Sequence, residues 1–520
     1  MRNIIALITP APVSHRTAEE NMGIGYLASV LRSNKHEVLV IDGWLEGLDT
    51  AGIIKRLSQN IHNLVFVGVS CYRSNIKPAK ELVSGLKVLS AELPIIAGGY
   101  GPTFYPEEFL AAGFDIVAIG EAEETILKLA NYYTGKKAAE LSGIKGIAYV
   151  KDNRLIKTKK PELIKNIDNL PFPDRDTLDL AKSRKCAINI LSSRGCLGNC
   201  AFCSIAAFQR KSTGITWRQR GINNFVDELE HLFNLGVQHF KVIDDSFVEP
   251  PRDAAWCKRF ADEVQSRKIK ILLRGSIRAD RVSEEVLLHL RQAGFFSFSC
   301  GIENASQTAL KRMGKSAKVM DNLAAVGLFK KHNIYLQAGM ILFDPETTMV
   351  ELRENYNFLA SYPWIITKGI FTEMYAASGT RFHDKLAQQN RGKAVPNDLS
   401  SQIANKTVRL CYNLLKIWHK SICDIYDKAI DPISCPKALQ EKEYQEFHKI
   451  YTKLNHVNLQ FFKEVLDIAE GMTLCKSEQL AFVSKHLERN KAAISKISAS
   501  LDKLYLKAGI SYDANRNPFL

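Results

Sequence analysis

The stretch that decides the fold is Ser192-Ser193-Arg194-Gly195-Cys196-Leu197-Gly198-Asn199-Cys200-Ala201-Phe202-Cys203. It places Cys196, Cys200 and Cys203 at C-x3-C-x2-C spacing in a loop that follows an apolar run of strand length. Thiolates are the ligands of iron–sulfur clusters, and three on one loop can hold three irons of a [4Fe–4S] cube and leave the fourth open to a small molecule. A zinc site would need a fourth ligand nearby, which the sequence does not supply. Zinc, or plainly buried thiols, are the alternative interpretations.

The cysteine loop opens a long series of alternating strand-like and helix-like segments. Strands are expected at residues 187–192, 239–243, 269–273, 296–300, 335–342 and 369–374. Helices are expected at residues 225–235, 254–267, 284–292, 319–331 and 349–359. Six strand–helix units predict a closed or partial parallel barrel, with its chemistry at the carboxyl ends of the strands.

Residues 1–134 show the same rhythm before the cysteine loop. Strands are expected at residues 4–8, 38–41, 64–69, 95–97 and 116–119, and helices at residues 25–33, 50–60, 77–89 and 123–133. Continuous apolar strands between amphipathic helices predict a parallel sheet covered on both faces. Ligands of such sheets bind beyond the carboxyl ends of the strands, which here carry small or turn-forming residues. The pattern indicates a binding domain without naming its ligand.

The remaining segments complete an α/β organisation. Residues 143–160 are typical of a hairpin, and residues 170–175 form a proline-punctuated linker. The chain is helical from about Gln402 to Ala508, with an apolar stripe of Leu410, Leu414, Trp418 and Ile422. The predicted domains are a Rossmann-like domain (1–140), a hairpin and linker (141–180), a partial (β/α)6 barrel (181–400) and a helical carboxy-terminal region (401–520).

The cysteine loop resembles the cluster motif of the radical SAM superfamily, C-x3-C-x-aromatic-C, with Phe202 as the aromatic residue. The resemblance implies that the open iron binds S-adenosylmethionine and that one-electron reduction cleaves it to methionine and a 5′-deoxyadenosyl radical. It also implies an electron donor such as flavodoxin or ferredoxin. The S-adenosylmethionine contacts that it implies are Phe202, Asp245, Arg274, Ser276 and Glu303. The acidic residues among them could instead form ordinary ion pairs at the barrel end.

Together the two halves resemble the cobalamin-dependent branch of radical SAM enzymes, from residue 1 to about residue 385. The segments that carry this resemblance are residues 23–28, 67–70, 97–103 and 119–123. It implies that the first domain binds cobalamin through Ser70, Gly98, Gly99, Tyr100, Gly120 and Glu121. Many cobalamin proteins ligate cobalt through the histidine of an Asp-x-His-x-x-Gly motif, but no such motif surrounds His15, His36 or His62. A methylthiotransferase is excluded, because residues 1–134 contain only Cys71 and no second cluster motif.

Length and composition limit the number of domains and the class of protein. The 520 residues suffice for roughly three domains, and 46% hydrophobic with 24% charged residues is typical of globular proteins. No apolar run is long enough for a transmembrane helix, and the first residues lack a signal peptide, so a cytoplasmic location is expected. The net charge of +15 would suit an anionic partner. Without a block of like charges, a solvated basic surface is the simpler interpretation, and a nucleic-acid partner is not expected.

The leading hypothesis is an enzyme that methylates an unactivated carbon or a phosphinate of a small-molecule or peptide substrate. One S-adenosylmethionine would methylate cob(I)alamin, and a second would supply the radical that activates the substrate for methyl transfer from methylcobalamin. The first alternative is cobalamin-dependent cyclisation, rearrangement or oxidation without methyl transfer. The second is a non-catalytic cobalamin-binding sensor, which the intact cysteines argue against. The carboxy-terminal helices either shape the substrate pocket or only pack against the barrel, and no catalytic residue is assigned.

Overall fold

A computed structural model of the chain describes residues 3–11, 19–72, 75–136, 140–389, 399–434 and 438–512. The chain divides into two compact units. The first comprises Met1–Cys196 and Ser204–Leu235, and the second comprises Leu197–Cys203 and the chain from Gly236 onward. Within the described residues, no helix combines the length and the apolar composition needed to cross a bilayer.

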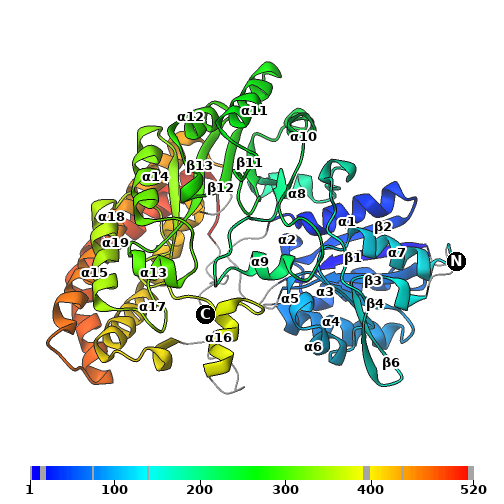
Figure 1. The fold of residues 1–520 in the computed structure, drawn as a ribbon, viewed down its shortest axis with the longest axis horizontal. Helices are drawn as coiled ribbons and strands as arrows, with labels where there is room; N and C mark the ends of the chain where they lie inside the picture. Colours follow the sequence, from blue (N-terminus) through cyan, green and yellow to red (C-terminus); the bar gives the residue numbers. More distant parts are fainter. Residues whose placement is uncertain are drawn as a thin grey trace. The chain divides into compact units, whose positions relative to one another are not determined.

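The first unit is built on a seven-stranded sheet with the order β2-β1-β3-β4-β5-β6-β7 (Figure 1). Its parallel strands are β1 (Ile4–Thr9), β2 (Glu37–Asp42), β3 (Leu64–Ser70), β4 (Ile95–Gly98) and β5 (Ile116–Ala118). The antiparallel hairpin of β6 (Ile147–Lys151) and β7 (Arg154–Lys157) extends the sheet beyond β5. The five predicted strands and the hairpin are therefore confirmed.

Helices cover both faces of this sheet, as the apolar strands predict. Alternate residues of β1 point to opposite faces. Ala6 and Ile8 pack in a core with α3 (Thr50–Ser58) and α4 (Ile76–Leu89). Ile5 and Leu7 pack in the other core, with α1 (Met22–Ser33) and α7 (Glu123–Tyr133). Three short helices were not predicted: α2 (Gly43–Glu46) follows β2, and α5 (Tyr100–Phe104) and then α6 (Pro106–Ala111) follow β4.

The remainder of the first unit leads to the cysteine loop and away from it. Residues 170–175 are non-helical, as predicted, and Arg32 of α1 holds this linker through ion pairs of 2.8 Å to Asp174 and 2.7 Å to Asp176. The elements that follow are α8 (Leu178–Ser183), β8 (Ile188–Ile190), β9 (Ser193–Arg194), α9 (Ser204–Gln209), β10 (Arg218–Gln219) and α10 (Ile222–Asn234). Strands β9 and β10 pair as an antiparallel ribbon.

The second unit contains parallel strands separated by helices. Strands β11 (His239–Val242), β12 (Leu272–Arg278), β13 (Phe295–Glu303) and β14 (Tyr335–Met340) lie side by side in that order. Helices α11 (Ala254–Ser266), α12 (Glu284–Gln292), α13 (Gln307–Arg312), α14 (Val319–Lys331) and α15 (Met349–Ser361) lie between or after them. This is the parallel α/β arrangement of a partial barrel. Residues 369–374, predicted as the sixth strand, form no regular strand, and only isolated bridges pair Ile366 with Gln337 and Glu373 with Phe343.

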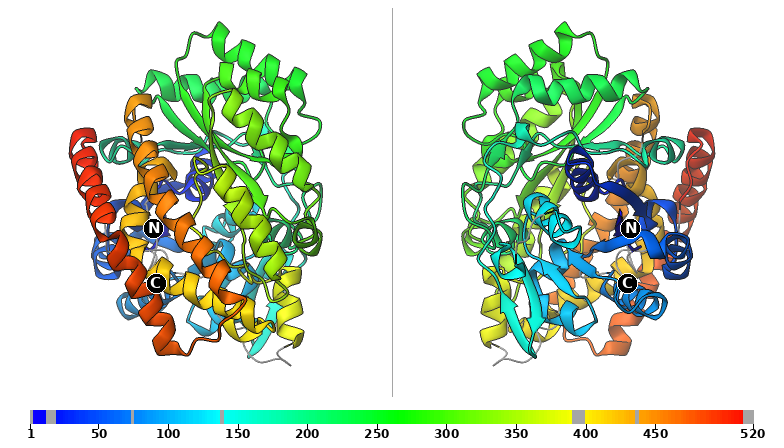
Figure 2. Two further views of the ribbon diagram at one scale, coloured as in Figure 1. Left: turned by 90° about the vertical axis from the view of Figure 1, so that its left-hand side faces the viewer. Right: turned by 90° about the vertical axis from the view of Figure 1, so that its right-hand side faces the viewer.

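The carboxy-terminal region is helical, as predicted. After α16 (Arg381–Gln389), the long helices α17 (Lys406–Ser434), α18 (Glu441–Ala469) and α19 (Lys476–Ala508) pack together, drawn in yellow to red in Figure 2. The predicted apolar stripe on α17 is buried. Its Trp418 stacks on Phe461 of α18 with ring centroids 4.4 Å apart and donates a 2.9 Å hydrogen bond to Asn458.

Candidate functional site

The cysteine loop leaves the first unit at a glycine that no other residue could replace without strain. Gly195 has φ +93°, and a Cβ at this position would overlap Gln209 Nε2 and Thr216 O. Those two atoms are joined by a 3.2 Å hydrogen bond between α9 and the segment that precedes β10. Gly195 therefore fixes the direction in which the chain reaches Cys196, which is partly buried.

In the second unit, backbone hydrogen bonds hold the part of the loop around Cys200. The Ala201 N–H donates to Met313 O at 2.8 Å, and Ala201 O accepts from Phe382 N–H at 2.9 Å. The Arg381 guanidinium also donates to Asn199 O. Burial raises the pKa of the Cys200 thiol, and the neighbouring Lys315 opposes that effect.

The donor set fits an iron–sulfur cluster, because Cys196, Cys200 and Cys203 are all free thiols at partly buried positions of one loop. Within the described part of the chain, no three His, Cys, Asp or Glu side chains lie close enough together to hold a metal ion. The assignment of a cluster to this loop therefore rests on the chemistry of the three thiols and on the hydrogen bonds that hold the loop, not on a preformed coordination geometry. The other described cysteines lie apart from the loop in sequence, and Cys435 is outside the described residues.

At the end of β11, two adjacent aspartates have different surroundings. Asp244 is buried and forms an ion pair of 3.5 Å with the fully buried Arg252, whose guanidinium lies over the Trp256 ring. Asp245 is exposed at the same strand end. The buried aspartate therefore forms an ion pair within the protein, and Asp245, the predicted cofactor contact, is exposed.

Strand β12 is longer than predicted, and this moves the expected strand end. Arg274 and Ser276 lie inside β12 rather than after it. The Arg274 guanidinium donates to Gln337 on β14 and to Ile433 O on α17. The true carboxyl end carries Arg278, which is 9% exposed and donates to Asp280 at 2.6 Å and Ser316 at 2.8 Å. Sequence analysis missed Arg278, although polar residues at positions 274, 276 and 278 alternate with Gly275 and Ile277, and this alternation could have indicated that the strand continues.

The end of β13 carries Glu303, the last predicted S-adenosylmethionine contact. Its carboxylate forms an ion pair with Lys315, with 3.0 Å between the two atoms. Sequence analysis did not identify Lys315 as a candidate site residue. Phe202, on the cysteine loop, is partly buried. The structure thus places Asp245 and Glu303 at strand ends, Phe202 on the loop, and Arg274 and Ser276 within a strand.

In the first unit, the carboxyl ends of β1 and β3 are joined by a residue that was not predicted. The Asn21 side chain donates to Thr9 Oγ at 2.8 Å and to Ser70 Oγ at 3.4 Å. Its oxygen accepts from Ile24 N–H and so caps α1. Ser70, a predicted cobalamin contact, is therefore part of a polar edge at the strand ends.

The end of β4 requires glycine for close backbone packing. Gly99 has φ +96° and ψ −163°, a conformation that is essentially restricted to glycine. A Cβ there would lie 2.9 Å from Cys71 O and 3.2 Å from Cys71 N. The next residue, Tyr100, packs on Phe104 and stacks on Phe208, with centroids 4.7 Å and 6.0 Å away. The Gly98-Gly99-Tyr100 turn therefore presents backbone and an aromatic ring at the sheet edge.

The end of β5 carries Gly120, another predicted cobalamin contact, and Glu121, whose carboxylate is already paired with arginine. Gly120 has φ +80°, and its N–H donates to Thr103 Oγ at 3.1 Å. Both oxygens of Glu121 accept from Arg218, at 2.7 and 2.9 Å, and Arg194 lies 3.3 Å away. Burial raises the pKa of Glu121, but the two guanidinium groups outweigh it and hold the pKa below its usual value. Glu121 therefore anchors the ribbon of β9 and β10 to this edge.

A cavity of about 280 Å³ opens at the carboxyl end of β1. Its lining includes Pro10 and Ala11, Thr50 at the start of α3, and Lys77 and Pro78 in the first turn of α4. Beside this edge, the completely buried Asn75 donates to Pro10 O, and its side-chain oxygen has no hydrogen-bond partner among the described residues. The cavity, the glycine turns and the buried amide fit a large ligand with polar groups, as cobalamin is.

The described histidines of this unit lie away from that edge. His36 immediately precedes β2, and His62 lies in the turn before β3, so both are at the amino ends of strands. His15 is outside the described residues. Neither His36 nor His62 is therefore placed to reach a ligand at the carboxyl ends.

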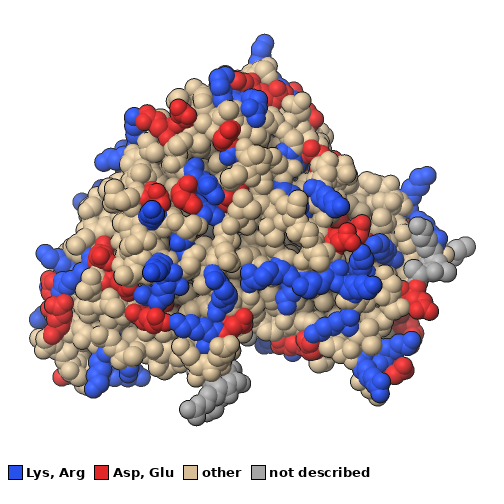
Figure 3. All heavy atoms as spheres, in the orientation of Figure 1, with Lys and Arg blue, Asp and Glu red and all other residues tan. Residues whose placement is uncertain are grey.

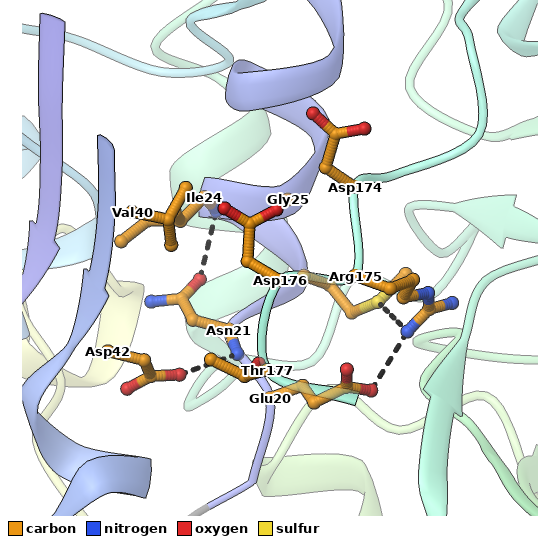
Figure 4. A pocket seen from close by; sticks show the side chains of 11 residues that line it. Glu20, Asn21, Ile24, Gly25, Val40, Asp42, Asp174, Arg175, Asp176 and Thr177 are labelled. Atoms are coloured by element: carbon orange, nitrogen blue, oxygen red, sulfur yellow. Dashed lines mark hydrogen bonds and ion pairs between the residues drawn. The ribbon is translucent and has the colours of Figure 1, made fainter. Parts of the chain in front are cut away.

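A small acidic pocket lies between α1, β2 and the linker within the first unit (Figure 4). Asp42, Glu20, Asp174 and Asp176 are among its lining residues. Asp42 is 3% exposed and caps α2 by accepting from Leu45 N–H. Burial raises the pKa of Asp42 from 3.8 to about 6, with smaller contributions from Glu46 and Glu20.

We expect Asp42→Asn to stabilise the protein at pH 7.5 by about 2–3 kcal/mol, because a raised pKa makes the charged carboxylate unfavourable in the folded state. The folded state binds the proton more tightly, so wild-type stability increases as pH falls from about 6 towards 4. The difference between variant and wild type should therefore vanish below about pH 4. Urea unfolding across this pH range measures it.

The matched control is Asp49→Asn, at an exposed cap that accepts from Gly52 N–H of α3. Asparagine caps helices about as well as aspartate, so this variant should stay within about 0.5 kcal/mol of wild type at every pH. Equal effects of the two substitutions, or a gain for Asp42→Asn that persists below pH 4, would contradict the burial explanation.

Lysine and arginine side chains are prominent on the face of the molecule in view. Figure 3 shows several of them gathered in one band and others dispersed among acidic side chains. Other basic residues form buried ion pairs, such as Arg175 with Glu20 and Glu228.

Comparisons with known proteins match both halves of the chain. The B12 binding domain model matches residues 14–130, and the Radical SAM superfamily model matches residues 190–359. An uncharacterised methyltransferase of Pyrococcus horikoshii is 28% identical over 347 residues, which are 65% of this chain and 72% of that protein. The anaerobic magnesium-protoporphyrin IX monomethyl ester cyclase of Synechocystis sp. is 28% identical over 344 residues, 64% of this chain and 67% of that protein.

Among solved structures, the cobalamin-dependent S-adenosylmethionine radical enzyme OxsB, with aqua-cobalamin and S-adenosylmethionine bound, has a TM-score of 0.71. The match covers 98% of this chain and 84% of that chain at 18% identity. At this identity the likeness establishes a shared fold.

Proposed function

We propose that this chain, which belongs to the radical SAM enzymes that carry a B12-binding domain, methylates an unactivated carbon or a phosphinate of a small molecule or peptide. The observation that carries the proposal is that one chain contains two candidate cofactor sites. One is the anchored loop of Cys196, Cys200 and Cys203, and the other is the glycine-lined carboxyl edge of the first sheet.

Each of these two sites would hold one cofactor. Cys196, Cys200 and Cys203 would ligate a [4Fe–4S] cluster, with Phe202, Asp245 and Glu303 near S-adenosylmethionine. Ser70 and the backbone at Gly98, Gly99, Tyr100 and Gly120 would contact cobalamin. When bound, these cofactors supply a carbon radical and a transferable methyl group, while the protein orients them and excludes water.

Two residues take altered roles in this proposal. Because Arg218 occupies both oxygens of Glu121, we assign Glu121 to holding the cobalamin edge rather than to contacting the ligand. Because Arg274 lies inside β12 and donates to Gln337 and to Ile433 O, we assign it to holding the strand rather than to contacting S-adenosylmethionine.

The cavity at the end of β1 suits the nucleotide tail of cobalamin. Lys77 supplies a positive charge, and the first turns of α3 and α4 supply backbone N–H groups, which together favour a phosphate. Asp49 and Glu81 also line the cavity. They would remain solvated at its rim or accept hydrogen bonds from the ligand.

The test uses S-adenosylmethionine with a deuterated methyl group, supplied with hydroxocobalamin and a strong reductant to the reconstituted full chain without oxygen. We expect labelled methyl recovered on cobalamin and 5′-deoxyadenosine as a separate product. A protein that binds both cofactors and forms 5′-deoxyadenosine, but transfers no label, would contradict methyl transfer.

That result would favour the second candidate, cobalamin-dependent cyclisation, rearrangement or oxidation. The observation behind it is the relative named as a cyclase, which matches this chain at 28% identity. Once a substrate is found, the product mass separates the two, because only methylation adds a methylene. Either reaction requires a one-electron donor, for which flavodoxin or ferredoxin is proposed.

A further inference from the structure

Lys315 lies directly behind the cysteine loop in the second unit. The residues just before it, Met313 and Gly314, form the surface on which the loop rests. Met313 O accepts the Ala201 N–H at 2.8 Å. Gly314 has φ +65°, and a Cβ there would lie 3.4 Å from Asn199 O. Residues 313–315 therefore pack along the backbone that flanks Cys200.

The Lys315 ammonium forms a buried ion pair with Glu303. The Nζ and Oε1 atoms are 3.0 Å apart, and the two side chains are 6% and 13% exposed. Two features of β13 accommodate the pair. Glu303 adopts φ +62°, an unfavourable conformation for a residue with a side chain. A Cβ at Gly301 would overlap Glu303 Oε1 and lie 2.7 Å from Lys315 Nζ.

Lys315 keeps its charge in this position. Burial lowers its pKa, but Glu303 and the Cys200 thiol more than offset that effect, and the net pKa is raised. The pair is tied to the loop by geometry, because Lys315 directly follows Met313 and Gly314, which pack against the backbone on either side of Cys200. A fixed positive charge and a fixed negative charge therefore both act on the loop at Cys200.

We propose that Lys315 and Glu303 are positioning residues of opposite charge that set the reduction potential of the cluster held by Cys196, Cys200 and Cys203. Lys315 favours the uptake of one electron, and Glu303 opposes it, because net charge and buried surroundings tune such potentials. This inference rests on the proposed function for the existence of the cluster. It adds a control of how readily the cluster is reduced.

The test is a redox titration of the reconstituted full chain, without S-adenosylmethionine, using titanium(III) citrate and mediators with detection by electron paramagnetic resonance. Lys315→Met should move the midpoint to more negative potential, and Glu303→Gln should move it to more positive potential. Each shift should change the ratio of reduced to oxidised cluster at a fixed potential by about tenfold, or about 59 mV for a one-electron couple. The double variant should titrate near wild type.

Two further variants control for structure. Lys311→Met removes an exposed lysine of α13, four residues before Lys315, and should leave the midpoint unchanged. Lys315→Arg keeps the charge and should stay close to wild type. If Lys315→Met takes up no iron, Glu303→Gln and Lys315→Arg still decide the matter.

The outcomes separate the two proposals. A wild-type protein that holds no cluster would overturn the proposed function. A wild-type cluster whose midpoint is insensitive to both single substitutions, or moves in the same direction in both, would overturn only the inference. Opposite shifts support it, because a general loosening of the loop has no reason to change sign with the charge removed.

Discussion

Replacing Cys203 by alanine is expected to abolish both iron uptake and the cleavage of S-adenosylmethionine. The three cysteines are the only thiols on the loop, so the variant would leave two ligands for the cluster. Cys203 is partly buried, so the fold of the iron-free protein should change in stability by no more than about 1 kcal/mol. Iron analysis, 5′-deoxyadenosine formation and thermal unfolding of the iron-free protein measure these effects.

The control for this experiment is Cys475→Ser, at an exposed position that caps α19. Serine is itself a favoured cap, so iron uptake and stability should both match wild type. A Cys203→Ala protein that retained the wild-type iron content and formed 5′-deoxyadenosine would refute the assignment of this loop as the cluster site.

Gly195→Ala should be among the most disruptive single substitutions in the chain, with an expected loss of about 3–5 kcal/mol in the free energy of unfolding. The positive φ accounts for about 1–3 kcal/mol, and the overlap with Gln209 and Thr216 adds a similar cost. Relief of that overlap would displace the chain immediately before Cys196. We therefore expect impaired iron uptake in whatever protein folds, measured together with the denaturant midpoint.

Gly327→Ala provides the opposite expectation for the same chemical change. Gly327 is an exposed residue inside α14, and a Cβ there would meet no atom within 4 Å. Alanine in a helix interior is favoured over glycine by about 0.5–1 kcal/mol, so this variant should be slightly more stable than wild type. Similar midpoints for the two glycine variants would show that Gly195 is not constrained as described.

The regular elements were predictable where one local signal dominated. The first five strands are buried on both faces and therefore read as continuous apolar runs. Helices α12 and α14 begin and end at the predicted residues. The short helices α2, α5 and α6 gave no such signal, because a helix of one or two turns carries too few residues for a periodic pattern. All three also contain glycine or proline near their start.

The barrel strands were harder to predict at their ends. Strand β12 continues through Gly275 to Arg278, and polar residues at positions 274, 276 and 278 interrupt the apolar run that marked its start. Those polar side chains are tolerated because Gln337, Asp280 and Ser316 supply partners. Residues 369–374 have the composition of a strand, yet a single isolated bridge, from Glu373 to Phe343, pairs them with the chain that follows β14.

The sequence by itself determined the cluster motif. The spacing of the three cysteines on one loop is a local property, so it can be read from those residues and their neighbours. Tertiary structure alone decided which charged groups come together. Arg218 meets Glu121 across 97 positions of sequence, and Lys315 meets Glu303 at the end of β13, where Gly301 leaves room for both side chains. Such ion pairs produce no periodic pattern in the sequence. A buried charge needs only one partner nearby, and the path of the backbone determines which residue that partner is.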